Sequence, residues 1–483
     1  MPRDPMTIPA EQFIRDFTKE LRSNNAAIFA GAGLSIPAGF VDWKGLLKEI
    51  ISDLGLDPEI ETEYVTLAQY HCNEKQSRNR LTQTIFEHFA TTKIPTANLE
   101  ILARLPIHTF WTTNYDKLIE TALTNARKIP DVKYTMEQLT VTRPKRDAVV
   151  YKMHGDIDHP TEVVITKDDY ERYPLKMGFF ISALKGDLIS KTFLFLGFSF
   201  TDPNIDYILS RVRATYEKHQ RLHYCILRKA AKGDGETPEA FETRRLKQEY
   251  FIKDLKRFGI QTVFVADYHE ITNILQRIEN RYKRTSILLS GAAHEFGVWE
   301  QREANEFLHK LCYQIVSSGN RVITAFGLGV GSAIINGALA SIEAQGKSVS
   351  EEHLVMRPFP QIATGGADLA TRWTAYRRSM ASSSGIAIYV FGNKLVDGKV
   401  VPSGGMQEEF KIACEAGVKP LPIGCTGYMA EALWKQVLAD FDSFYPSAHS
   451  SFRELFEKLG TKPGNLDDLL TTTHKLIQKL QED

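Results

Sequence analysis

The sequence predicts an α/β protein of two domains, each built on a largely parallel sheet. Short apolar runs rich in branched and aromatic residues alternate with longer amphipathic stretches, as strands alternate with helices in such folds. The chain has 483 residues, more than one hydrophobic core usually serves. The strand pattern restarts after a polar helix, so we expect one domain over residues 1–284 and a second over residues 285–483.

The first half opens with a predicted helix, and six candidate strands follow it: Ala26–Phe29, Ile107–Thr112, Ala148–Met153, Thr192–Leu196, His223–Leu227 and Thr262–Val265. Each of the first four runs directly into a polar or glycine-containing loop. Doubly wound parallel sheets place ligands at the carboxyl ends of their strands. Four such loops therefore predict one shared cleft.

The second half repeats this alternation. A polar helix over Ile271–Arg284 leads into five candidate strands: Ser286–Leu289, Arg321–Thr324, Leu354–Met356, Ile386–Phe391 and Pro420–Ile423. We expect them to form a separate core.

Composition argues against several classes of protein. Lys plus Arg and Asp plus Glu both number 59, so the chain lacks the positive charge on which most nucleic-acid binders rely. The N-terminus has no apolar signal-like region, and apolar runs such as Phe193–Phe200 are too short to span a bilayer. We expect a cytoplasmic protein with no nucleic-acid or membrane partner. The cysteines form no CxxC pair, which predicts reduced thiols and no metal site: Cys72, Cys225, Cys312, Cys414 and Cys425.

The first loop is rich in glycine. In AAIFAGAGLSIPAGFVDW, Gly31 and Gly33 follow a strand and precede a helix that Asp42 is placed to cap. Glycines in such a loop let backbone N–H groups approach a pyrophosphate, and a helix N-terminus favours its negative charge. A glycine turn alone is weak evidence for a dinucleotide site.

The next two loops carry residues suited to catalysis. WTTNYDKL contains Asn114 and Asp116, although Asp116 also fits a helix cap and Asn114 a turn. YKMHGD ends a strand with His154, which fits either a proton acceptor or a structural hydrogen bonder.

The fourth loop, FLGFSFTDPNID, places Gly197 and Ser199 after a strand. Asp202 and Pro203 read as the N-cap and first residue of the helix that follows.

Together these loops resemble the sirtuin family, whose members share a GAGxS loop, a TQNxD-type segment, a catalytic HG pair and a later GxS. The corresponding segments are Gly31–Ser35, Thr112–Asp116, His154–Gly155 and Gly197–Ser199. The resemblance implies a Rossmann-like cleft with NAD as substrate. It implies that Asn114 and His154 are catalytic, with His154 as general base, and that Asn114 and Asp116 hold the nicotinamide end. The residues it assigns to the dinucleotide are Ala30, Gly31, Gly33, Ser35, Asp42, Asp116, Gly197 and Ser199.

Two departures from the sirtuins shape the expected reaction. Deacylase sirtuins carry a four-cysteine zinc module between the HG and GxS segments, whereas residues 155–195 contain no cysteine. The arginine of the family's GIPDFR segment is also missing from GFVDWK. We therefore expect water to replace the acyl-lysine peptide as acceptor, and NAD to be hydrolysed to ADP-ribose and nicotinamide.

The second half contains its own glycine loops. TAFGLGVGSAII places Gly327 and Gly329 after a strand and before a helix, which suits a nucleotide or phosphate, or else a tight packing contact. PSGGMQEEF places Glu409 about one turn into another helix. Of the adjacent arginines in AYRRSM we expect Arg377 to be the functional one and Arg378 to be solvated.

This half resembles the SLOG domains, relatives of the LOG nucleotide-processing proteins, through a strand that ends in Ser-Gly, the GxGxG loop and a degraded PGGxxxxE segment. The degraded segment favours nucleotide sensing over catalysis. The implied ligand-binding residues are Ser290, Gly291, Gly327, Gly329, Arg377, Lys394 and Glu409.

A sirtuin-like domain followed by a SLOG domain is similar to the NAD-consuming effectors of the Thoeris antiviral defence system. That resemblance implies activation by a cyclic ADP-ribose isomer supplied by a TIR-domain enzyme. It also implies a homo-oligomer, a tetramer or larger. Three alternatives stay open: an NAD-dependent protein deacylase, a catalytically silent nucleotide-binding module, and an active LOG-type phosphoribohydrolase in the second half.

Overall fold

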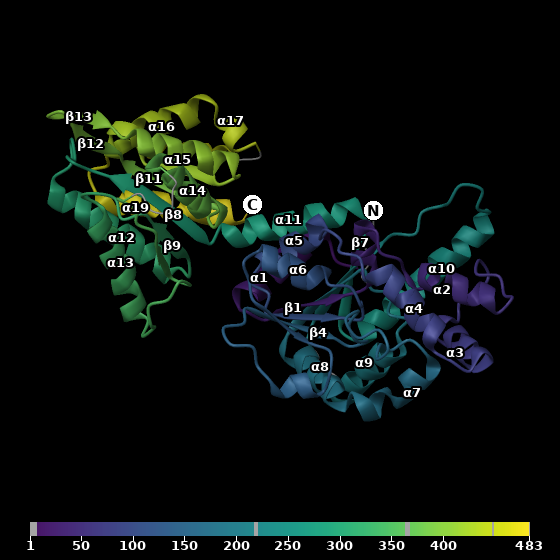
Figure 1. The fold of residues 1–483 in the computed structure, drawn as a ribbon. Helices are drawn as coiled ribbons and strands as arrows, with labels where there is room; N and C mark the ends of the chain where they lie inside the picture. The colour runs from purple at the N-terminus through teal and green to yellow at the C-terminus, as the bar shows by residue number, and fades with distance from the viewer. Residues whose placement is uncertain (1–6, 217–220, 363–367, 447–448, 483) are drawn as a thin grey trace. The chain divides into compact units, whose positions relative to one another are not determined.

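The chain divides into two compact units, Met1–Glu279 and Asn280–Asp483, here called the N-terminal and C-terminal units. The structure is a computed structural model that describes residues 7–216, 221–362, 368–446 and 449–482. Helix α11 (His269–Lys283) contains the boundary (Figure 1). The boundary that we expected after residue 284 lies just beyond the same helix.

The N-terminal unit is built on a seven-stranded parallel sheet of order β3-β4-β2-β1-β5-β6-β7. Its strands are β1 (Ala26–Ala30), β2 (Thr109–Thr112), β3 (Pro130–Lys133), β4 (Ala148–Lys152), β5 (Thr192–Leu196), β6 (His223–Arg228) and β7 (Ile260–Val265). All six predicted strands are present, and the parallel α/β class is confirmed. Strand β3 was not predicted, because two of its four residues, Asp131 and Lys133, are charged and form a buried ion pair of 2.7 Å.

Helices cover both faces of this sheet: α8 and α9 lie on one face, and α1, α5 and α6 on the other (Figure 1). The helices of the unit are α1 (Ala10–Arg22), α2 (Trp43–Asp53), α3 (Tyr64–Lys75), α4 (Asn79–Phe89), α5 (Ala97–Arg104), α6 (Leu118–Asn125), α7 (Lys167–Lys176), α8 (Gly178–Ser190), α9 (Pro203–Tyr216), α10 (Pro238–Arg257) and α11. The predicted capping of α2 by Asp42 is confirmed, because its carboxylate accepts from the Gly45 N–H at 2.8 Å.

Strand order places the four predicted loops side by side. They follow β1, β2, β4 and β5, which are consecutive in the order β4-β2-β1-β5. The chain places β2, β3 and β4 on one side of β1, with β4 between β2 and β3, and then returns to add β5 on the other side. Such a switch point opens a crevice at the carboxyl ends of the two strands, which is where doubly wound sheets bind ligands.

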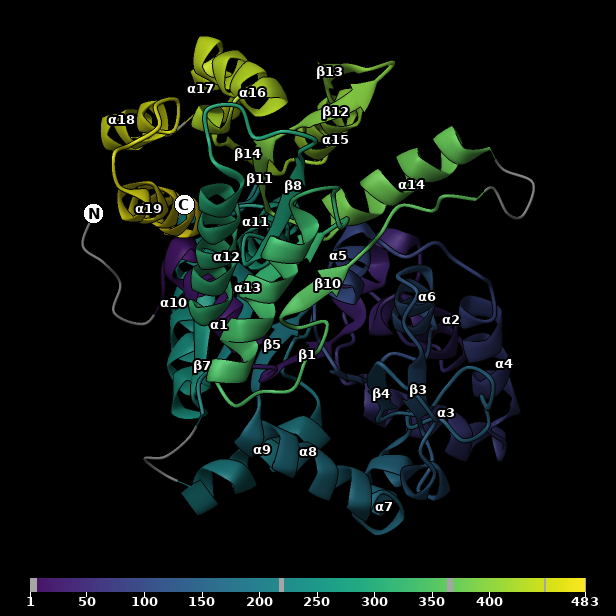
Figure 2. The same ribbon diagram turned by 90° about the vertical axis from the view of Figure 1, so that its left-hand side faces the viewer.

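The C-terminal unit has a second parallel sheet, of order β10-β9-β8-β11-β14. Its strands are β8 (Ser286–Ala292), β9 (Arg321–Thr324), β10 (Leu354–Met356), β11 (Ile386–Phe391) and β14 (Lys419–Pro422), all five of which were predicted. An antiparallel hairpin, β12 (Asn393–Val396) and β13 (Lys399–Pro402), stands beside α15 at one end of the unit (Figure 2). It was missed because its residues are mostly exposed and form no apolar run.

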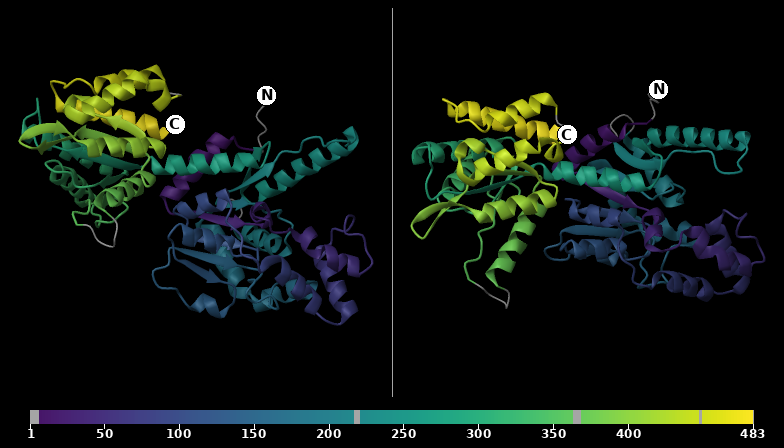
Figure 3. Two further views of the ribbon diagram at one scale, coloured as in Figure 1. Left: turned by 45° about the horizontal axis from the view of Figure 1, so that its top comes forward. Right: turned by 90° about the horizontal axis from the view of Figure 1, so that it is seen from above.

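The helices of this unit are α12 (Gln301–Ser317), α13 (Gly331–Ala344), α14 (Leu369–Ser382), α15 (Gly404–Glu415), α16 (Tyr428–Ala439), α17 (Phe441–Phe444), α18 (Ser450–Lys458) and α19 (Leu466–Glu482). Helix α19 packs on α12 and α18. Figure 3 shows the C-terminal helices, in yellow, lying together on the unit. Among the residues that the structure describes, no helix combines the length and apolar character needed to cross a membrane.

Candidate functional site

The loops after β1 and β5 touch each other through glycine. The Gly31 N–H donates to the Leu196 carbonyl and the Gly33 N–H to the Gly197 carbonyl, both at 2.9 Å. A Cβ on Gly31 would lie 2.3 Å from the Gly197 oxygen, and Gly197 itself has φ +62°. The structure thus gives these glycines a different role from the predicted one. Their N–H groups join the two loops rather than facing a pyrophosphate, and the missing side chains allow the loops to meet.

A cavity of about 1010 Å³ opens over this contact. Residues after β1, β2 and β5 line it, together with the start of α2, the segment before α3 and one side of α7. The residues that line it include Gly33, Asp42, Trp43, Lys44, Thr113, Lys167, Tyr170, Gly197, Ser199 and Asp202. Its size and its place at the switch point suit a dinucleotide.

Asn114 is held beside this cavity by a hydrogen-bonded chain. Its Nδ2 donates to the Gly31 carbonyl and to the Ser35 Oγ, both at 3.0 Å. Ser35 in turn donates to the Asp116 carboxylate at 2.7 Å. The second oxygen of that carboxylate accepts from the Leu118 N–H at the start of α6, as in the helix-capping alternative. Both oxygens of Asp116 thus accept hydrogen bonds within the protein, and the carboxylate holds Asn114 in place through Ser35.

A small pocket of about 40 Å³ lies beside these residues and next to the cavity. Ser35, Asn114 and Asp116 line it, and it shares Asp42 and Thr113 with the larger cavity. Asn114 thus lines a pocket that adjoins the place where a dinucleotide fits.

His154 lies behind the cavity wall, only 1% exposed. Its Nε2 is 3.2 Å from the Asp202 carboxylate, which also accepts from the Tyr170 hydroxyl at 2.9 Å. Tyr170 and Asp202 line the cavity, and the Tyr170 ring lies edge-on to the imidazole. Burial alone would raise the pKa of Asp202, but its contacts with His154 and Tyr170 hold that pKa below the ordinary value. Asp202 is therefore an anion that joins His154 to the cavity.

Most of the residues expected to bind the dinucleotide are brought together here. Ala30 and Gly31 are the exceptions, because both are buried and neither lines the cavity or the small pocket. The Ala30 carbonyl accepts from the Thr112 hydroxyl instead. Sequence reasoning missed Tyr170 and Lys167, because both lie on helix α7 and follow no strand. It identified Asp202 only as a helix cap, a role that the structure confirms through N–H bonds from Asn204 and Ile205. No cluster of three or more metal-ligating side chains occurs among the described residues.

In the C-terminal unit, three of the predicted ligand-binding residues form one polar group. The Ser290 hydroxyl donates to the Glu409 carboxylate at 2.5 Å, and Arg377 Nε lies 3.9 Å from the other oxygen of that carboxylate. Arg377 also pairs with Glu408 at 2.7 Å and stacks over the Phe359 ring at 5.1 Å. Burial raises the pKa of Glu409, although Ser290 and Arg377 oppose the shift. We call Ser290, Arg377, Glu408 and Glu409 the Arg377 group.

The glycines of this unit pack as tightly as those of the first. A Cβ on Gly327 would lie 1.7 Å from the Gly291 carbonyl oxygen. Gly329 has φ +75°, and a Cβ there would lie 2.0 Å from the Ala293 oxygen. Lys394 lies exposed on β12, opposite Val401, and has no hydrogen bond or ion pair with the Arg377 group. Among the described residues, contacts thus join Ser290, Arg377 and Glu409 in one group and Gly291 with Gly327, whereas Gly329 packs on Ala293 and Lys394 lies apart.

Comparison with known proteins agrees with this two-unit architecture. Residues 108–255 match the SIR2-like domain family, and residues 270–480 match the Sir2- and TIR-associating SLOG family. The chain is 49% identical to NAD(+) hydrolase ThsA of Bacillus cereus (strain MSX-D12) over 97% of its length and 98% of that protein. It is 47% identical to NAD(+) hydrolase ThsA of Acinetobacter baumannii (strain 532279) over 95% and 97% of the two chains. Defense-associated sirtuin 2 of Bacillus subtilis is 26% identical over 48% of this chain and 24% of its own. With near-complete coverage at this identity and both domains in order, the chain belongs to the ThsA family.

Proposed function

We propose that this protein is an NAD glycohydrolase effector of bacterial anti-phage defence, which cleaves NAD to ADP-ribose and nicotinamide. The observation that carries the proposal is the Asn114 amide, fixed between Gly31 and Ser35 beside the cavity at the switch point of the sheet. The names of the ThsA relatives support the same reaction.

The cavity offers partners for each part of NAD. Lys167 brings positive charge to its wall, which suits a pyrophosphate. Lys44 also lines the wall, but its ammonium is paired with Glu59 at 2.6 Å. The Trp43 indole and Tyr170 ring supply flat apolar surface for a base or a nicotinamide ring. The small pocket beside Asn114 has room for a water, so we place the ribose that carries the reacting bond in the larger cavity next to it.

Cleavage breaks the bond between ribose C1′ and the nicotinamide nitrogen, and the bonding electrons leave with neutral nicotinamide. A water oxygen bonds to C1′ and gives up a proton. We assign that proton to the pair of Asp202 and His154, because Asp202 lines the cavity and contacts the imidazole at 3.2 Å. Asn114 positions the water or the ribose hydroxyls.

Water is the acceptor we propose, because the chain lacks the zinc module with which deacylases hold their peptide. Purified protein incubated with NAD is expected to release nicotinamide and ADP-ribose in equal amounts. Acetyl-lysine peptide should not change the products. Deacylation at a rate matching NAD loss would instead establish the deacylase alternative, and no release with or without cyclic ADP-ribose isomers would leave a binding module.

Asp202→Asn is expected to lower kcat roughly 100-fold, within the range of general acid–base effects. Asparagine keeps the shape and the oxygen that accepts from Asn204, but it removes the anion beside His154. Steady-state nicotinamide release measures the effect, and Asp206→Asn on the exposed side of the same helix is the control. Equal activity of the two variants would exclude the proton route.

The same charge gives a pH dependence. Because the pKa of Asp202 is depressed in the folded protein, ionisation stabilises the fold at pH values above the unfolded pKa of about 3.9. That stabilisation is lost as the pH falls through the folded value. The melting temperature of Asp202→Asn should therefore fall less steeply as the pH is lowered than that of the unchanged protein. Thermal melts between pH 3 and 7 measure the difference.

We further propose that the C-terminal unit senses a cyclic ADP-ribose isomer, made by a TIR-domain enzyme, at the Arg377 group, and that the protein works in the cytoplasm as a homo-oligomer. Cationic side chains suit a pyrophosphate, and a carboxylate suits ribose hydroxyls. Moving a population from mostly inactive to mostly active requires about 5.5 kcal/mol of differential affinity.

A further inference from the structure

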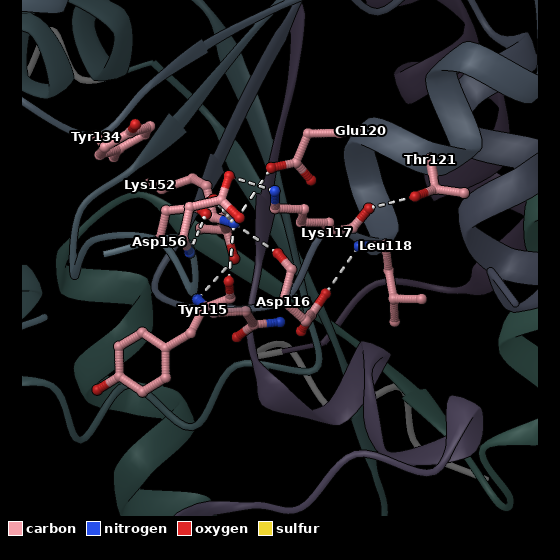
Figure 4. A network of polar contacts seen from close by, with 12 residues as sticks. Tyr115, Asp116, Lys117, Leu118, Glu120, Thr121, Tyr134, Lys152 and Asp156 are labelled. Atoms are coloured by element: carbon pink, nitrogen blue, oxygen red, sulfur yellow. Dashed lines mark hydrogen bonds and ion pairs between the residues drawn. The ribbon is translucent and has the colours of Figure 1, made fainter. Parts of the chain in front are cut away.

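A fully buried ammonium lies between the two loops that carry the proposed catalytic residues. Lys152, the last residue of β4, is 0% exposed. Its Nζ donates to the backbone carbonyls of Tyr115 at 3.0 Å and Asp116 at 2.6 Å. It also forms ion pairs with Asp156 at 2.5 Å and Glu120 at 3.2 Å, and Figure 4 shows these groups converging on it.

The pairing keeps this lysine charged. Burial alone would lower the pKa of Lys152, because the charged form loses its hydration. The carboxylates of Glu120 and Asp156 outweigh that effect and raise the pKa above its ordinary value. A buried charge with this many partners is costly to assemble and fixes the geometry of what it binds.

What it binds are the two catalytic loops. Tyr115 and Asp116 directly follow Asn114 in the loop after β2. Asp156 follows His154 in the loop after β4, so the Lys152–Asp156 ion pair closes a turn that contains His154.

Other bonds tie the same two loops together. The Ile157 N–H donates to the Tyr115 carbonyl at 3.1 Å. Lys117 forms an ion pair with Asp158, and the Asp158 N–H donates to Asp156 at 2.9 Å. The ammonium of Lys152 is the buried centre of this junction (Figure 4).

We propose that Lys152 is a positioning residue for NAD cleavage: its ammonium fixes the loops over residues 113–117 and 154–158 so that Asn114 and His154 keep one spacing. This inference rests on the proposed function. It predicts a loss of turnover rather than of substrate binding, because the cavity wall is formed largely by other segments. A misplacement of about 1 Å at reacting groups costs about 100-fold in rate.

Lys133 provides a matched control. It is 4% exposed and lies on β3, the strand next to β4. Its ammonium pairs with Asp131 at 2.7 Å and donates to the Val141 carbonyl, so its contacts lie in a different segment of the chain from the catalytic loops. Lys133→Met therefore removes a buried charge from the same sheet without touching the junction.

Lys152→Met is expected to lower kcat for nicotinamide release about 100-fold with KM for NAD changed less than about threefold. Lys133→Met should keep kcat within about twofold, although its melting temperature falls too. Activity is measured on the full chain at a temperature where both variants are folded. If Lys152→Met does not fold, Asp156→Asn replaces it, with an expected loss of about tenfold.

Hydrogen exchange supplies a readout that needs no activity. Peptides covering residues 113–118 and 153–158 should exchange faster in Lys152→Met than in Lys133→Met. The inference is overturned if Lys152→Met keeps the kcat of the unchanged protein, if both variants lose kcat equally, or if the two loops exchange alike. If the unchanged protein releases no nicotinamide either with or without cyclic ADP-ribose isomers, the proposed function fails, and the exchange comparison alone then decides the positioning role.

Discussion

Asn114→Ala will reduce kcat for nicotinamide release by roughly 10²- to 10³-fold, as the loss of one well-placed polar group does in other active sites. Both N–H groups of this amide are occupied, one by the Gly31 carbonyl and one by Ser35. Its Oδ1 is therefore the atom left to accept a hydrogen bond from a ribose hydroxyl or a water. Alanine removes that acceptor.

The fold should tolerate this change. The backbone N–H of Asn114 donates to the Thr112 hydroxyl at 3.0 Å, and alanine keeps that bond. The next residues stay fixed through the carbonyls of Tyr115 and Asp116. A thermal melt close to that of the unchanged protein, together with the lost turnover, would separate chemistry from stability.

Ser35→Ala is expected to have an intermediate effect on kcat. It removes the hydroxyl that accepts from Asn114 and donates to Asp116, so the amide loses one of its two anchors but keeps its acceptor. We expect a kcat between those of the unchanged protein and Asn114→Ala. If Asn114→Ala turned over NAD at the full rate, the amide would have no part in the reaction, whatever Ser35→Ala did.

The fold could be predicted because the central strands are buried on both faces. Strands of this kind are continuous apolar runs, and Thr192–Leu196 and Ile386–Phe391 occur as predicted, residue for residue. Strand β3 has no such apolar run, because it contains Asp131 and Lys133, whose buried charges neutralise each other. Pairing of that kind is decided by tertiary contact, which the local pattern does not contain.

The site was predictable to the level of its loops. The four motifs indicated which strand ends matter, and the strand order β4-β2-β1-β5 explains why they meet. The pattern did not say which atoms are left free. Gly31 and Gly33 use their N–H groups on the neighbouring loop, and Asp116 uses both carboxylate oxygens on Ser35 and Leu118.

Lys152 and Tyr170 had no signal of their own in the sequence. A lysine at the end of an apolar strand reads as the point where the strand leaves the core, yet this one is fully buried. Tyr170 lies on helix α7, far along the chain from the motif glycines, and reaches the cavity only through the tertiary fold.

Arg377→Ala will abolish stimulation of nicotinamide release by cyclic ADP-ribose isomers. The expected difference between the adjacent arginines is present in the structure: Arg377 is 8% exposed, whereas Arg378 is exposed. One guanidinium nitrogen of Arg377 lies 3.0 Å from the point where a Cβ on Gly405 would stand, at the start of α15. A phosphate bound there would lie next to the Arg377 guanidinium and the N-terminus of α15, and Gly405 has no side chain to exclude it.

Two comparisons make this prediction specific to the ligand. Arg378→Ala, one residue away but solvated, should keep stimulation. Glu408 now neutralises Arg377 at 2.7 Å and must yield it to an entering phosphate. Glu408→Gln should therefore tighten binding of the isomer, measured by calorimetry on the full chain, while Arg377→Ala removes it. Arg377 is the cation of the Arg377 group, so a phosphate bound there would lose affinity when alanine replaces it. If Arg377→Ala bound the isomer and responded to it like the unchanged protein, the activator site would lie elsewhere.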